Sequence, residues 1–86
     1  MEYRTSLVWR RTSQDFTYNT YNRAHEVRFA NVTLPASAAP EFKGTPERVN
    51  PEEAFVGSLS SCHMLTFLAF AARKHLSLDA YDDNAV

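Results

Sequence analysis

The sequence predicts an α+β fold, in which an N-terminal antiparallel β-hairpin or meander is followed by one long buried central helix. Two observations lead to this prediction. In the first third of the chain, apolar and polar residues alternate with the period of a β-strand, and turn-forming residues separate the alternating runs. Beyond residue 49, a helix-start signal is followed by a long stretch of small and apolar residues.

The β-rich part begins with a first strand that is predicted within residues 3–10. Its residues alternate in a way that suits a strand with one buried face. Residues 12–23 are rich in Ser, Thr, Asn and Asp, and are expected to form a turn and a loop. A second extended run is predicted at residues 25–29, with a continuation through residues 32–34 left open.

A loop and a helix start follow. Residues 35–49 hold three of the four prolines and one of the two glycines, which predicts a loop. Asn50 is a favourable N-cap residue, Pro51 suits the first helical position, and two glutamates occupy the first turn. The helix is expected to end near Arg73, where positive charge complements the C-terminal end of the helix dipole.

The central helix has too few polar residues to face water on its own. Within residues 59–72, the plainly polar side chains are Ser60, Ser61, His63 and Thr66. A helix that is apolar on nearly every side must be covered on nearly every side, and the predicted hairpin covers one face only. We therefore expect a partner. Residues 84–86 resemble the beginning of a third strand, so residues 1–86 are expected to form a single domain that lacks its C-terminal half.

Composition argues against several classes of function. The 9 basic and 10 acidic residues give a net charge of −1 and are interspersed, which argues against a nucleic-acid partner. The longest apolar run, residues 64–72, is shorter than the roughly 20 residues that a membrane span needs. No secretory leader pattern precedes the first strand, and a single cysteine does not form an intrachain disulfide. We expect a cytoplasmic protein.

Cys62 is the main candidate for chemistry. A cysteine near a cation or a helix N-terminus has a larger thiolate fraction, and thiolate is the reactive form. The opposing interpretation is that Cys62 packs as a small hydrophobic residue, as free cysteines often do.

Glu52 would lie about 15 Å from Cys62 along a continuous helix. Contact between them would need a helix break near Gly57, or an intermediary such as an arginine, for which Arg23 is one of several candidates.

No metal site is predicted. His25, His63, His75 and Cys62 do not show the spacing of zinc ligands. His63 follows Cys62 directly, and adjacent helical residues do not face each other, so a Cys–His pair is not expected either.

The segment RVNPEEAFVGSLSSCHMLTFLAFAARKHL, residues 48–76, resembles the central segment of the OsmC/Ohr family of osmotically inducible and organic hydroperoxide resistance proteins. The resemblance extends upstream through YNRAHEVRF and LPASAAP. It implies an intertwined homodimer, or a complex with a C-terminal half, in which central helices lie between sheets. It also implies a thiol peroxidase that reduces organic hydroperoxides or hydrogen peroxide without a cofactor.

The resemblance also assigns roles to residues. Cys62 matches the peroxidatic cysteine, and Glu52 matches a glutamate that orients an arginine, for which Arg23 is the best match. An apolar substrate pocket is expected to include Phe55, Leu59, Met64 and Phe67. The family's second, resolving cysteine is missing, so an external thiol reductant is expected to complete the cycle. The alternative function is a non-catalytic or truncated OsmC-like domain that serves dimerisation or binds an apolar ligand.

Overall fold

The computed structural model describes residues 1–86 and confirms the α+β class. The element order is β1 (Ser6–Val8), β2 (His25–Arg28), β3 (Thr33–Ala36), the 3-10 helix η1 (Pro40–Phe42) and α1 (Pro51–Arg73). The chain forms two compact units, Met1–Glu52 and Glu53–Val86, which are described in turn.

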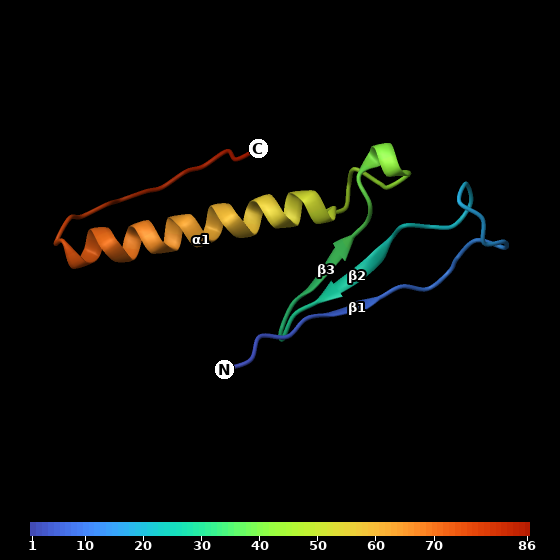
Figure 1. Ribbon diagram of the computed structural model, residues 1–86, viewed down its shortest axis with the longest axis horizontal. Coiled ribbons are helices and arrows are strands. Elements are labelled where there is room, and N and C mark those ends of the chain that lie inside the picture. The colour runs from blue at the N-terminus through green and yellow to red at the C-terminus, as the bar shows by residue number, and fades with distance from the viewer. The chain divides into compact units, whose positions relative to one another are not determined.

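The first unit contains a three-stranded antiparallel meander with the order β1-β2-β3 (Figure 1). In its register, Leu7 pairs with Val27, and Val27 pairs with Leu34. Directly paired residues point to the same face of a sheet, so these side chains form one apolar row across all three strands. The row remains partly uncovered in the single chain, because Leu7 is 70% exposed.

The third strand of the sheet is β3, a segment that the sequence offered only as a continuation of the second run. A turn at residues 29–32, closed by the Phe29 amide donating to the Val32 carbonyl at 2.8 Å, makes it a separate strand. Pro35 lies in β3 opposite Glu26. Proline is tolerated there because β3 is an edge strand, where a missing N–H removes no bond to a further strand.

The proline-rich loop after β3 is fixed by backbone and side-chain hydrogen bonds. The Ser37 amide donates to the Val49 carbonyl at 2.9 Å, and the Val49 amide donates to Pro35 at 3.3 Å. Ser37 is fully buried, and its hydroxyl oxygen accepts the Thr45 amide at 3.2 Å. This loop therefore contributes the most buried residues of the unit, although its composition predicts only irregular structure.

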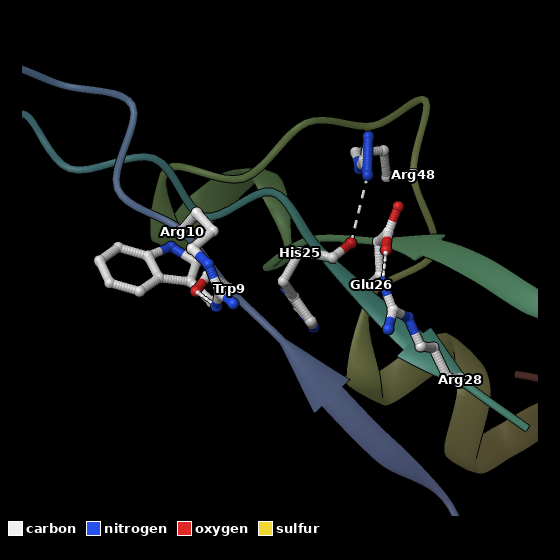
Figure 2. Close-up of polar contacts among 6 residues, drawn as sticks. All are labelled: Trp9, Arg10, His25, Glu26, Arg28 and Arg48. Atoms are coloured by element: carbon white, nitrogen blue, oxygen red, sulfur yellow. Dashed lines mark hydrogen bonds and ion pairs between the residues drawn. The ribbon is translucent and has the colours of Figure 1, made fainter.

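Arg48 joins the end of this loop to the sheet. Its Nε donates to the Ala36 carbonyl at 2.9 Å. One of its terminal nitrogens donates to the His25 carbonyl at 3.2 Å (Figure 2). His25 and Ala36 are paired across β2 and β3, so one guanidinium binds both strands at the same level. Planar guanidinium groups suit such two-point binding because their donors are fixed in a fork.

The second unit is built on α1, whose predicted start and end are confirmed at Pro51 and Arg73. The helix ends in a Schellman motif. His75 adopts a left-handed conformation with φ 61°, its amide donates to Ala72 at 3.0 Å, and the Leu76 amide donates to Ala71 at 3.0 Å. These bonds satisfy carbonyls that a helix end otherwise leaves without partners.

The third strand that was predicted to begin at residues 84–86 is not formed. Residues 77–86 contain no strand. Instead, they run back beside α1 (Figure 1). The Ser60 hydroxyl donates to Asp83 at 2.5 Å, and the rings of Phe67 and Tyr81 lie 5.9 Å apart between centroids. The prediction was wrong because this segment has α1 beside it rather than a strand edge, and a strand needs a neighbour to satisfy its backbone.

Most of α1 is exposed in the single chain. Ala71 is its one buried residue, and the less exposed residues recur at helical spacing along one stripe: Val56, Ser60, Met64 and Leu68. By length and composition α1 would suffice to cross a membrane, since its most apolar 18-residue window has a mean hydropathy of 1.5. The core helix of a soluble protein passes the same test. The predicted burial of α1 is thus not present within one chain and stays a prediction about an assembly.

Candidate functional site

Cys62 lies in the middle of α1 and is exposed. The helix runs without a break through Gly57, so the helix break that the sequence left open is not formed. The rise of about 1.5 Å per residue separates Glu52 from Cys62 by about 15 Å along the axis. An exposed thiol in a regular helix is accessible to a soluble oxidant, in contrast to the packed cysteine of the opposing interpretation.

The predicted pocket residues divide between two faces of α1. At about 100° per residue, Phe55 and Leu59 lie within about 60° of Cys62 around the helix axis. Their side chains are 64% and 57% exposed. By the same geometry, Met64 and Phe67 point about 140° or more away from Cys62.

Met64 and Phe67 belong to the packing of the C-terminal segment. Met64 is half-buried in the less exposed stripe, and Phe67 contacts Tyr81. Within the second unit, the thiol therefore shares its face with Phe55 and Leu59.

Arg23 lies in the first unit, in the segment that leads into β2. One terminal nitrogen donates to the Tyr21 carbonyl at 2.5 Å, and the other donates to the Tyr18 carbonyl at 2.6 Å. The guanidinium carbon lies 3.6 Å from the centroid of the Tyr21 ring and 4.9 Å from that of Tyr18. The arginine is thereby held in one orientation by two carbonyls and two aromatic faces.

Glu52 is exposed in the first turn of α1. The ion pairs of the first unit are Glu2 with Arg4, and Glu26 with Arg28 at 3.0 Å. Neither includes Arg23 or Glu52. The predicted roles of Arg23 and Glu52 toward Cys62 stay predictions, since Cys62 belongs to the other unit.

An aromatic cluster that sequence reasoning did not single out adjoins Arg23. Trp9 and Phe16 lie 6.1 Å apart between ring centroids, Trp9 and Tyr21 6.3 Å, and Phe16 and Tyr21 5.1 Å. The Trp9 indole donates to the Asn22 carbonyl at 2.8 Å, which ties the cluster to the segment before β2. The run DFTYNTY, residues 15–21, could have indicated this cluster, because it places three aromatic residues in an otherwise polar loop.

This cluster lines a hollow of about 370 Å³, which we call the aromatic hollow. Its lining comes entirely from the first unit: Trp9, Phe16, Tyr21, Asn22, Arg23, His25, Ser37, Ala38 and Pro51. Aromatic walls with a few polar groups at the edge are typical of small-molecule sites.

A second hollow of the first unit, about 340 Å³ in volume, is lined by Val8 and Ala24 together with polar and charged residues, among them Arg10, Glu26 and Arg48. Its charged groups already have structural partners. Arg10 donates to the Trp9 carbonyl, Glu26 pairs with Arg28, and Arg48 donates to the His25 carbonyl (Figure 2). The charged groups around this hollow therefore serve the fold.

No protein-family model matches the sequence, and a comparison with curated proteins finds no significant match. The resemblance to OsmC/Ohr proteins therefore depends on the motif in residues 48–76 and on the residues upstream of it.

Proposed function

We propose that this chain is a cytoplasmic, thiol-dependent peroxidase of the OsmC/Ohr type, with Cys62 as the residue that attacks the peroxide. The observation that carries the proposal is the position of the single cysteine: Cys62 is exposed in the middle of a long apolar helix, beside exposed Phe55 and Leu59. An apolar surface around a thiol favours an organic hydroperoxide over hydrogen peroxide, because the organic group removes apolar area from water when it binds.

The reaction balances without a metal or an organic cofactor. The Cys62 thiolate attacks the distal oxygen of the hydroperoxide, an S–O bond forms and the O–O bond breaks. The leaving oxygen takes a proton and departs as an alcohol, while the cysteine is oxidised to a sulfenic acid. Two equivalents of an external thiol then restore Cys62, releasing water and a disulfide of the reductant. In this proposal Arg23 stabilises the thiolate and Glu52 orients the arginine.

The experiment is a titration of the purified protein with cumene hydroperoxide, in which free thiol and sulfenic acid are followed by mass spectrometry. Cys62 is expected to oxidise at least an order of magnitude faster than free cysteine, since a positioned and stabilised thiolate is the more reactive species. Arg23→Ala is expected to slow the oxidation, and Arg11→Ala, which changes an exposed arginine of the same unit, is expected to leave it unchanged.

A relocated thiol is the sharpest control. The double variant Ser61→Cys, Cys62→Ser moves the thiol by about 100° around the helix, from one exposed position to the next. If exposure alone governs reactivity, the relocated thiol reacts as fast as Cys62. The peroxidase proposal requires it to react much more slowly. A Cys62 that is no faster than free cysteine would remove the proposal altogether.

One observation favours the second candidate function, a non-catalytic domain for dimerisation. Three large apolar side chains on one face of α1 are more than half exposed: Phe55, Leu59 and Leu65. Contiguous exposed apolar surface marks interaction sites in soluble proteins. Sedimentation of wild type and of Leu59→Glu tests whether this face forms a homodimer. A charge at residue 59 would weaken such a dimer, so the variant is expected to show a smaller dimer fraction. Dimerisation with an unreactive Cys62 would favour the second function.

A further inference from the structure

The aromatic hollow of the first unit has walls that suit a flat ring. Its three rings, from Trp9, Phe16 and Tyr21, meet each other in edge-to-face or tilted pairs rather than in parallel stacks. Such pairs leave ring faces and edges for a further aromatic group, which gains about 0.5–1.5 kcal/mol per pair beyond area burial. A volume of about 370 Å³ lies near the lower end of the range for ligand pockets, which limits the ligand to a small molecule.

Arg23 supplies a cation in the lining of the same hollow. Two of its five N–H groups are donated to the Tyr21 and Tyr18 carbonyls, which leaves three for a ligand. Neither ion pair of the first unit includes Arg23, so no carboxylate neutralises its charge there. Lys43, in the loop after β3, places a second positive charge near this segment, with its Nζ 5.7 Å from the Tyr18 ring centroid.

Anchoring and charge together define the ligand. The guanidinium plane is fixed by the Tyr21 ring at 3.6 Å, so its donors are already oriented and a ligand does not have to order them. A planar carboxylate matches such an oriented fork. We propose that the aromatic hollow binds a small aromatic carboxylate, with the ring against Trp9, Phe16 and Tyr21 and the carboxylate on Arg23. All residues of this site belong to the first unit, and one of them, Arg23, is also the arginine that the proposed function assigns to the thiolate.

The test uses the full chain and benzoate as the probe. Trp9 is the only tryptophan, so the protein has a single indole N–H resonance, and that group lies in the wall of the hollow. Titration with benzoate is expected to shift this resonance saturably. Cyclohexanecarboxylate keeps the charge and loses the ring, and is expected to bind about 2- to 12-fold more weakly. Benzyl alcohol keeps the ring and loses the charge, and is expected to bind at least about 10-fold more weakly.

Two matched variants assign the charge to Arg23. Arg23→Gln is expected to remove the preference for benzoate over benzyl alcohol, whereas Arg11→Gln, at an exposed arginine outside the lining, is expected to keep it. Cys62→Ser is expected to bind benzoate as wild type does, so benzoate binding can fail or succeed independently of the reactivity of the thiol.

The comparison of benzoate with benzyl alcohol in the wild-type protein tests the proposal even if Arg23→Gln disorders the loop. An indole resonance that does not respond to benzoate, or that responds equally to benzoate and benzyl alcohol, would overturn the proposal.

Discussion

Gly44 is the residue whose replacement by alanine the structure forbids most directly. A methyl group there would lie 1.6 Å from the Ala38 carbonyl oxygen and 2.3 Å from its carbonyl carbon. Both atoms belong to the backbone, so no side-chain rotation relieves the clash, and the loop must open by about 1.5–2 Å to reach ordinary contact distance. Opening it breaks the bond from the Thr45 amide to Ser37 and that from the Gly44 amide to Ala39 at 3.1 Å.

At about 1 kcal/mol for each hydrogen bond, Gly44→Ala should destabilise the first unit by about 2 kcal/mol. In a domain of this size that lowers the melting temperature by about 8–16 °C. The assay is thermal unfolding followed by Trp9 fluorescence, which reports on the first unit.

Gly57→Ala is the matched control, because the same methyl group meets nothing within 4 Å in α1 and should stabilise the helix by about 1 kcal/mol. Equal melting temperatures for Gly44→Ala and wild type would refute the reasoning about the loop. A loss of stability in Gly57→Ala would mean that something outside the single chain packs against Gly57.

Three further predictions concern the ends and supports of the elements. His75→Gly should stabilise α1 by about 1 kcal/mol, measured as the thermal loss of helical circular dichroism, because glycine adopts φ 61° without the strain of a side chain. Arg48→Gln should destabilise the first unit by about 2 kcal/mol in denaturant unfolding, since the side chain that joins two strands is lost. Ser60→Ala should speed amide exchange in residues 77–86 without changing helix content, because its bond to Asp83 holds that segment.

The sequence was most informative where local chemistry decides the structure. Both ends of α1 were predicted, the start from Asn50 and Pro51 and the end from the basic residues near Arg73. The mechanism at the C-terminal end was not predicted, because the capping residue in the left-handed conformation is His75 rather than the usual glycine. Local propensity thus located the helix end, while the residue that forms the cap was visible only in three dimensions.

Non-local pairing accounts for what the sequence did not predict. The β3 strand contains Pro35, which reads as a loop residue until its place at a sheet edge is known. The order of the following loop depends on Ser37 and Arg48, which bind partners 8 to 23 residues away. The aromatic hollow is likewise assembled from separate segments, so its residues carry no common motif.

The position of Cys62 constrains any assembly that covers α1. Phe55 and Leu59 share the face of the thiol, so a partner that removes them from water must come close to Cys62 as well. A flat, fully packed cover would leave no path for a peroxide, and the peroxidase proposal therefore requires a cover with a gap over the thiol. Small residues beside Cys62, among them Ser58 and Ser61, leave room for such a gap. Replacing Ser58 by Leu should close it, and should suppress oxidation of Cys62 by cumene hydroperoxide more than oxidation by the smaller hydrogen peroxide. Equal suppression by the two oxidants would argue against a shaped opening.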